Sequence, residues 1–221
     1  MKFSNRTEAG KILAKELEKH PVLLTNSLIL AIPRGGVPVS YSVAEELKIP
    51  FYLVITKKLS HPNNQEVAIG AIAPDGTYEL NKKFEFQGFS KDTINQIRDK
   101  ALEKVQRRVK KYTQGSQLNI KGKHIIIIDD GIATGFTALV AGKYVKKNGA
   151  KTANLAIPVS PLSSINRVEK IFDKVICPQK IDSYSFSVGS FYADFHQNSD
   201  EELFEYMEKA EKEGLLYKNF S

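Results

Sequence analysis

Residues 124–137 read HIIIIDDGIATGFT, and this stretch, from His124 to Thr137, decides the fold. Its run of four isoleucines predicts a strand that is buried on both faces. Asp129 and Asp130 follow the strand directly, and a short loop of mostly small residues then opens a helix. In open parallel sheets, ligands bind at the carboxyl ends of the strands. The stretch therefore predicts a parallel sheet with a ligand site at this strand end.

Buried strands and amphipathic helices alternate on both sides of this stretch. Strands are predicted at residues 28–32, 51–56, 153–157 and 174–177. Helices are predicted at residues 4–20, 37–48, 90–115, 135–148, 163–170 and 199–214, the last opened by a capping box of Ser199 and Glu202. Residues 57–66 are expected to form a polar loop, and residues 67–80 a β-hairpin. This pattern predicts an α/β fold with a mainly parallel sheet and helices on both of its faces.

The chain of 221 residues is expected to form a single domain, residues 1–221. Its core is expected at about residues 22–177, between terminal helices at 4–20 and 199–214. The aromatic-rich segment 178–196 breaks the alternation, and we expect it to form a small accessory lobe, the hood.

Composition excludes several classes of protein. The single cysteine, Cys177, rules out an intramolecular disulfide and a cysteine-based zinc site. No apolar run approaches the roughly 18 residues of a membrane span, and no secretory signal opens the chain. We therefore expect a cytoplasmic protein with no membrane partner. The net charge of +7 fits a polyanionic partner, but it also occurs in proteins that have none.

The predicted helix at 90–115 carries many of these positive charges. Acidic residues are interspersed among them, and no helix-turn-helix or aromatic stacking motif accompanies them. We interpret this as a solvent-exposed helix face, and we expect no nucleic-acid partner. The cations are Arg98, Lys100, Lys104, Arg107, Arg108, Lys110 and Lys111.

The loop after the isoleucine strand offers hydrogen-bond donors beside acceptors. Free N–H groups at the start of a helix favour a phosphate, and Thr134 and Thr137 add hydroxyls. Asp129 and Asp130 can accept hydrogen bonds from vicinal hydroxyls, so together these groups suit a sugar phosphate. The alternative is that Asp130 or Thr134 merely caps a helix. P-loop and dinucleotide fingerprints do not occur in the sequence, and the acidic pair of a receiver domain lies near that fold's N-terminus.

Residues 125–137 resemble the phosphoribosyl pyrophosphate-binding motif of type I phosphoribosyltransferases. That motif has four apolar residues, two acidic residues, a few small residues and then Thr-Gly-x-Thr. The resemblance implies that Asp129 and Asp130 hold the ribose hydroxyls and that residues 133–137 cradle the 5-phosphate. Phe136 stands where the family usually has a small or polar residue, and it could narrow the pocket. The implied substrate-binding residues of this loop are Asp129, Asp130, Gly131, Ile132, Ala133, Thr134, Gly135, Phe136 and Thr137.

Two further segments resemble the same family. Residues 32–36, with Arg34, Gly35 and Gly36, are similar to its pyrophosphate loop, where an arginine fork suits phosphate oxygens. Lys57 and Lys58 follow a predicted strand at the place where the family has a basic residue and a lid over the pyrophosphate. Because neighbouring strand residues point to opposite faces, we expect only one of these lysines to reach the ligand.

The resemblance implies transfer of a phosphoribosyl group from 5-phosphoribosyl-1-pyrophosphate to a nitrogen nucleophile such as a nucleobase, with release of pyrophosphate. Mg²⁺ would be held mainly by the substrate rather than by a protein metal site. The implied catalytic residues are Arg34, Lys57, Lys58, Asp129 and Asp130.

The position and identity of the acceptor are less defined. We expect the acceptor near Phe186, Phe191 or Tyr192, although at least two of these rings would fill the hood's own core. The alternative function is a non-catalytic sensor of phosphoribosyl pyrophosphate that regulates a partner. A homodimer is one expectation for the assembly. Within the family, the chain most resembles a group of bacterial predicted phosphoribosyltransferases of unassigned substrate. The residues that carry this resemblance are Phe3, Arg6, Ala9, Gly10 and the runs AIPRGGV, AIGAIAPDG and GSFYADF.

Overall fold

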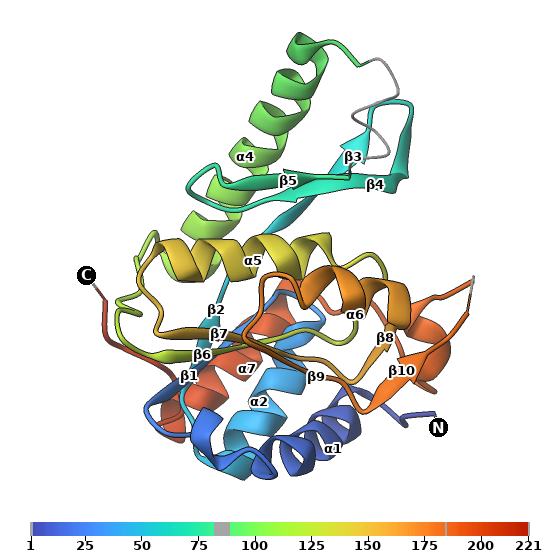
Figure 1. Ribbon diagram of the computed structural model, residues 1–221. Coiled ribbons are helices and arrows are strands. Elements are labelled where there is room, and N and C mark those ends of the chain that lie inside the picture. The colour runs from blue at the N-terminus through green and yellow to red at the C-terminus, as the bar shows by residue number, and fades with distance from the viewer. Residues whose placement is uncertain (1, 82–88, 184, 221) are drawn as a thin grey trace.

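The structure, a computed structural model, describes residues 2–81, 89–183 and 185–220. Its centre is a parallel sheet of five strands in the order β2-β1-β6-β7-β9 (Figure 1). β6 is the middle strand, which explains why its four isoleucines are fully buried. The strands are β1 (Ser27–Ala31), β2 (Phe51–Leu53), β6 (His124–Ile128), β7 (Thr152–Ala156) and β9 (Lys174–Ile176).

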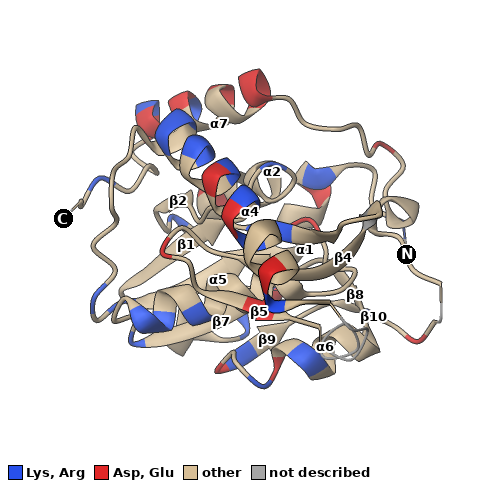
Figure 2. Ribbon diagram, turned by 90° about the horizontal axis from the view of Figure 1, so that it is seen from above, with Lys and Arg blue, Asp and Glu red and all other residues tan. Residues whose placement is uncertain are grey.

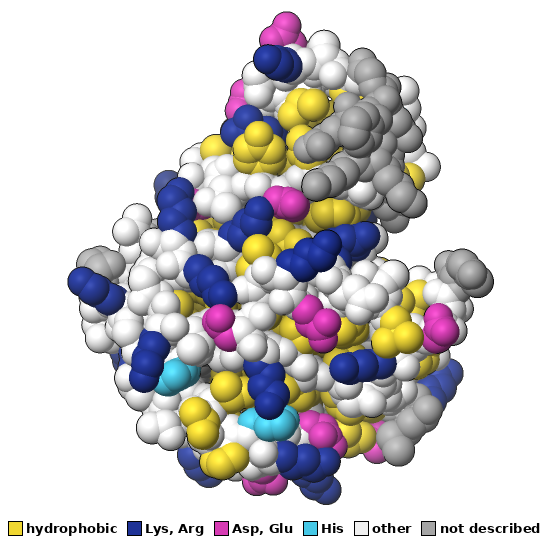
Figure 3. Space-filling model, in the orientation of Figure 1, with side chains coloured by type: hydrophobic (Ala, Val, Ile, Leu, Met, Phe, Trp, Pro, Cys, Tyr) yellow, Lys and Arg dark blue, Asp and Glu magenta, His cyan; other side chains and the backbone are white. Residues whose placement is uncertain are grey.

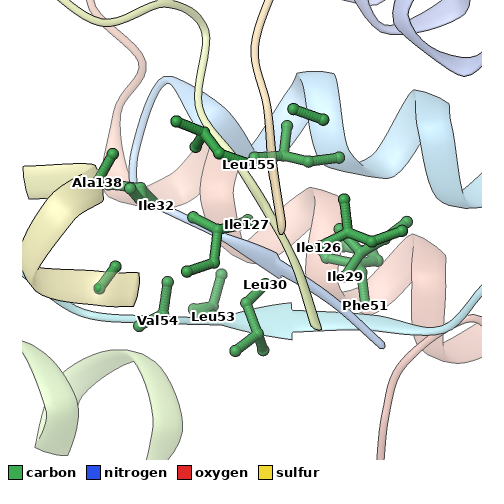
Figure 4. Packing of buried hydrophobic residues seen from close by; sticks show 14 of the residues in the cluster. Ile29, Leu30, Ile32, Phe51, Leu53, Val54, Ile126, Ile127, Ala138 and Leu155 are labelled. Carbon is green, nitrogen blue, oxygen red and sulfur yellow. The ribbon is translucent and has the colours of Figure 1, made fainter. Parts of the chain in front are cut away.

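Helices cover both faces of this sheet, so the predicted α/β class is confirmed. Figure 1 shows α1, α2 and α7 on one side of the sheet and α5 on the other. Apolar side chains from the strands pack against these helices in one continuous core, part of which is drawn in Figure 4. The helices are α1 (Arg6–Glu18), α2 (Gly36–Leu47), α5 (Phe136–Lys147), α6 (Leu162–Val168) and α7 (Asp200–Lys212), and α7 begins with the predicted capping box of Ser199 and Glu202.

Beyond the end of β2, a separate lobe projects from the sheet (Figure 1). It consists of three antiparallel strands and the long helix α4, and we call it the projecting lobe. Phe136 and Val140 of α5 pack against Ala71 of its second strand and Ala73 just beyond that strand, which helps to dock the lobe on the body of the molecule. The elements are β3 (Lys57–His61), β4 (Asn64–Ile72), β5 (Tyr78–Leu80) and α4 (Lys91–Thr113).

Two ion pairs tie this lobe to α5. Lys143 Nζ lies 2.6 Å from Glu79 Oε2, and Lys147 Nζ lies 2.8 Å from Asp75 Oδ2. Figure 3 shows Lys and Arg side chains gathered along the boundary between the lobe and the body. The lobe is therefore fastened along the second half of α5.

Two strand predictions are wrong. Residues 57–66 are not a polar loop but form β3 and the start of β4, because Lys57, Lys58 and Leu59 pair with apolar residues of β4. Leu59 is fully buried while Lys58 is exposed, so one face of β3 packs and the other meets solvent. The strand predicted at residues 51–56 ends at Leu53, where pairing with β1 stops, although residues 54–56 remain buried.

Short elements complete the fold near the hood. β8 (Val159–Pro161) and β10 (Gln179–Ile181) form a small parallel sheet, and 3-10 turns lie at η1 (Pro21–Leu23) and η2 (Val188–Phe191). Phe3 pairs with Tyr192 in an isolated bridge, and their rings lie 5.2 Å apart between centroids. The N-terminal segment is thereby fastened to the hood.

Candidate active site

The loops after β1 and β6 touch because these two strands are neighbours in the sheet. The carboxylate of Asp130 fills the space beside Gly35, so a Cβ placed there would lie 2.1 Å from Asp130 Oδ2. A Cβ at Gly36 would lie 2.7 Å from the carbonyl oxygen of Ile128. The structure thus brings the Arg-Gly-Gly loop and the acidic pair into one site, as their positions after parallel strands lead one to expect.

The loop from Gly131 to Gly135 leads into α5 with its helix start open. Gly135 adopts a left-handed φ of 76° at the N-cap, and no side chain caps the helix there. The first backbone hydrogen bond of the helix is donated by Leu139 to Gly135, so the N–H groups of the preceding turn stay available. Neither Asp130 nor Thr134 caps α5, which removes the structural alternative considered for this motif. An open helix start is suited to a phosphate.

Helix α6 braces this loop from behind. Ser164 Oγ donates to the carbonyl of Ala133 at 2.6 Å, and Arg167 donates to the carbonyl of Thr134. Ala133 and Thr134 are exposed, whereas Ile132 is buried and donates its N–H to Val159. The loop therefore presents its exposed backbone from a fixed position.

Phe136 does not narrow the pocket, contrary to our expectation. Its side chain is 4% exposed and packs against Ala71 and Ala73 of the projecting lobe. The guanidinium of Arg167 lies 4.8 Å from the centroid of its ring. Thr137, which follows in the first turn of α5, is partly exposed.

Asp130 is paired with an arginine that lies 124 residues away in the chain. Arg6 Nε donates to Asp130 Oδ2 at 2.8 Å, and both side chains are largely buried. Arg6 also donates to the carbonyl of His196 at 2.9 Å, and its guanidinium lies 4.1 Å from the ring centroid of Phe195. Tyr192 donates its hydroxyl to the backbone oxygen of Asp130 at 2.6 Å. The N-terminal helix and the hood together fix the orientation of Asp130.

Burial raises the pKa of both carboxyls of the acidic pair. The protein packed around Asp129 raises the pKa of its carboxyl well above the ordinary value, and the neighbouring charge of Asp130 raises it further. Burial also raises the pKa of Asp130, although the Arg6 guanidinium opposes that shift. Charge on Asp129 is therefore unfavourable to the ligand-free fold.

Asp129→Asn should raise the melting temperature of the ligand-free protein near pH 7 by about 2 °C or more. A raised native pKa means that the folded carboxyl binds more protons than the unfolded one, so stability falls as pH rises above the unfolded value of about 3.9. The variant cannot titrate there, and its Oδ1 can still accept from the N–H of Asp130. Thermal melts from about pH 3.5 to 7 should show a gap that widens with pH. A variant less stable than wild type at pH 7 would contradict this assignment.

Positive charges gather where β1 and β2 end. Arg34 Nη1 lies 3.3 Å from Asp200 Oδ1, and Asp200 also accepts from Tyr112 Oη at 2.5 Å and from Lys111. Figure 2 marks the Lys and Arg positions along the ribbon of α4, which runs up to α7. Arg108 of α4 lies with Arg34 around one hollow in this region.

Of the two candidate lysines, the surroundings favour Lys57. Lys57 is half-buried, and its pKa is lowered by this burial and then by the nearby charges of Arg108 and Lys104. Lys58 is exposed on the other face of β3. Lys57 therefore lies near α4, where Lys104 is exposed as the sequence predicts and Arg108 is partly buried. The spacing of Lys104, Arg108 and Lys111 along one helix face is the signal that could have separated them from the other cations.

The hood places its aromatic rings largely against one another. The rings of Phe186 and Phe191 stack with their centroids 5.2 Å apart, and Tyr192 is 2% exposed. Phe195, which is 38% exposed and which the sequence analysis did not single out, packs against the guanidinium of Arg6. The core-filling role expected for at least two of these rings fits this arrangement.

Comparison with known proteins identifies the family. A family model described as the phosphoribosyl transferase domain matches residues 5–194. The chain belongs to the phosphoribosyl transferase domain family. The crystal structure of TT1426 from Thermus thermophilus is similar to this family member, with a TM-score of 0.76 and 26% identity, over 93% of this chain and 97% of that one.

Two curated proteins are similar in sequence to this member of the family. They come from Mycobacterium tuberculosis strains CDC 1551 / Oshkosh and H37Rv, and each is named as an inferred phosphoribosyl transferase. Both are 33% identical to the chain over 214 residues, which is 96% of this chain and 47% of each relative. The chain thus spans about half the length of these relatives. Within the described residues, no helix has the length and apolar character needed to cross a bilayer.

Proposed function

We propose that this phosphoribosyl transferase domain binds 5-phosphoribosyl-1-pyrophosphate and transfers its phosphoribosyl group to a nitrogen nucleophile. The observation that carries the proposal is the contact between the Arg-Gly-Gly loop and the acidic pair, beside an open helix start. In this arrangement the start of α5 binds the 5-phosphate, and Asp129 and Asp130 accept hydrogen bonds from the ribose hydroxyls. Residues 131–137 supply the backbone that approaches the phosphate.

The cations at the ends of β1 and β2 are assigned to the leaving group. In the reaction, the bond from the anomeric carbon to pyrophosphate breaks and a bond to the acceptor nitrogen forms. Pyrophosphate leaves with the electron pair, so negative charge grows on its oxygens in the transition state. Preorganised positive charge stabilises that change without reorganisation. Arg34, held by Asp200, and the half-buried Lys57 are the side chains we assign to this role.

Magnesium fits the donors that the site offers. Within the described part of the chain, no group of three or more His, Cys, Asp or Glu side chains could hold a metal ion. Asp129 and Asp130 are the carboxylates at hand, and Asp130 is already paired with Arg6. Mg²⁺ commonly combines few protein carboxylates with substrate phosphates and water. When bound, it would neutralise charge on the pyrophosphate.

The acceptor is assigned only as a class, a nucleobase-like nitrogen nucleophile between the Arg-Gly-Gly loop and the hood. No side chain is assigned as a general base. The chain spans about half the length of its curated relatives, and we propose that it acts as a single domain. A homodimer and a cytoplasmic location stay predictions from the sequence.

The test is a titration with phosphoribosyl pyrophosphate and Mg²⁺, followed by an assay of pyrophosphate release with a panel of nucleobases. Binding followed by acceptor-dependent release supports the transferase. Tight binding with no release on any acceptor supports the sensor instead. Absence of binding contradicts both functions.

A further inference from the structure

A hollow of about 320 Å³ lies beside Asp130, bounded by the Arg-Gly-Gly loop, α4 and the segment before α7. Three arginines line it, one from each of three distant parts of the chain: Arg6, Arg34 and Arg108. Asp130, Phe195 and Asn198 are also in its wall. The functional assignment so far uses Arg34 and Asp130 but leaves Arg108 and Asn198 without a role.

The wall of this hollow carries an excess of positive charge. Arg6 is neutralised by Asp130, and Arg34 shares Asp200 with Lys111. Arg108 forms no ion pair with any residue in the described parts of the chain. Its charge instead lowers the pKa of Lys57, which is also positive. Two cations are thus held near each other, and an anion bound to Arg108 in the hollow would relieve their repulsion.

Asn198 supplies an independent sign of a missing partner. The residue is 6% exposed, and its Oδ1 accepts no hydrogen bond from any described residue. Burial of an unpaired amide costs free energy, which a bound polar group would recover. Rotation of the side-chain amide by 180° exchanges Oδ1 for the NH₂ group, so Asn198 can accept from or donate to that group.

The hollow suits a small oxyanion better than a stacked aromatic base. One face of the Phe195 ring is covered by the Arg6 guanidinium at 4.1 Å, and Tyr192 lies 5.1 Å away between ring centroids. Both rings therefore already pack against other side chains of this region. Guanidinium forks match the oxygens of phosphates and carboxylates, and an amide can complete the set of donors.

We propose that Arg108 and Asn198 complete an oxyanion subsite with Arg34 in this hollow. The identity of the oxyanion rests on the proposed function: it is either the leaving pyrophosphate or an acidic group on the acceptor. Arg108 reaches the subsite from α4, so the projecting lobe contributes directly to binding. If pyrophosphate binds elsewhere, the subsite favours an acceptor that carries an acidic group over its neutral analogue.

Calorimetric titrations with four probes test this subsite: Mg²⁺-pyrophosphate, ribose 5-phosphate, orotate and uracil. Arg108→Gln and Asn198→Ala are compared with Arg107→Gln, a matched control whose side chain is exposed beside Glu103 on the same helix. For Arg108→Gln we expect at least tenfold weaker binding of one oxyanion probe, with ribose 5-phosphate affinity within about twofold of wild type. Asn198→Ala should weaken the same probe, and Arg107→Gln should match wild type. Thermal melts confirm that each variant is folded.

The probes distinguish the leaving group from an acidic acceptor as the source of the anion. They also test the subsite separately from the proposed transferase function. Loss of pyrophosphate binding in Arg108→Gln assigns the leaving group, whereas loss of orotate binding, with uracil bound poorly by wild type, assigns an acidic acceptor. The subsite is overturned if Arg108→Gln binds both probes as wild type does, or if wild type binds ribose 5-phosphate but neither probe at millimolar concentration. Arg108-dependent pyrophosphate binding without any ribose 5-phosphate or phosphoribosyl pyrophosphate binding would preserve the subsite and refute the transferase.

Discussion

Gly35→Ala should lower the affinity for phosphoribosyl pyrophosphate by about a hundredfold or more, a loss on the order of 3 kcal/mol. The backbone of Gly35 has φ −59° and ψ −33°, a conformation that alanine adopts freely, so the change adds only a methyl group. That methyl would lie 2.1 Å from Asp130 Oδ2, and Arg6 holds this carboxylate in place. The two loops must move apart, which displaces the Arg-Gly-Gly loop and the carboxylate to which we assign the ribose hydroxyls. Calorimetry on wild type and variant measures the loss.

The control for Gly35→Ala is Gly76→Asn, in the turn between β4 and β5. Gly76 has φ +81°, which asparagine tolerates, and a Cβ there meets no atom within 4 Å. This variant should bind as wild type does. Wild-type affinity in Gly35→Ala would show that the contact between the two loops is not needed for binding.

Lys57→Ala should lower kcat by about a hundredfold, the range seen when one transition-state donor is removed. Lys57 comes soon after β2, near the strand ends where we place the leaving pyrophosphate, and partial burial beside Arg108 and Lys104 strengthens its field. An interaction that grows as the leaving group gains charge affects turnover more than ground-state binding. The affinity for ribose 5-phosphate should therefore fall only slightly. Steady-state kinetics with an acceptor found by the nucleobase panel give kcat directly.

Lys58→Ala is the matched comparison, because Lys58 is the next residue of β3 and is exposed on its other face. Its kcat should stay within about twofold of wild type, as for a solvent-exposed charge. If turnover is unaffected in both variants, the leaving-group charge is misplaced, and Arg34 becomes the principal candidate. If only Lys58→Ala is slow, the assignment of faces along β3 is wrong.

The central strands and the loop that opens α5 were predictable because their determinants are local. Four isoleucines in a row allow few structures other than a strand buried on both faces. The glycines and carboxylates that follow β6 lie within ten residues, so their chemistry could be interpreted together. Parallel neighbours then bring Gly35 beside Asp130 without any further information.

β3 was missed because its evidence is not local. Lys57, Lys58 and Ser60 resemble a loop in polarity, and the strand exists through its pairing with β4. A polar strand of this kind has one face on the core and one in solvent, and only Leu59 shows the buried face clearly. Without its partner, the segment has no pattern long enough to separate strand from loop.

The partners of the acidic pair also could not be predicted from the sequence. Arg6 and Asp130 meet across 124 positions, and nothing in either segment indicates the other. The cations of α4 form a visible helix face, but whether that face meets solvent or a ligand depends on how the projecting lobe docks. That docking rests on packing of Phe136 and Val140 against Ala71 and Ala73, which no periodicity predicts.

The most direct test of the account is a thermal melt of the unmodified protein with phosphoribosyl pyrophosphate and Mg²⁺. Ligand at a hundred times its Kd should stabilise the fold by roughly 2.7 kcal/mol, which corresponds to a rise of several degrees. Ribose 5-phosphate should give a smaller rise, because it reaches the phosphate loop and the acidic pair but not the cations of Arg34 and Lys57. No rise at millimolar phosphoribosyl pyrophosphate would contradict the central claim that these two loops form its binding site.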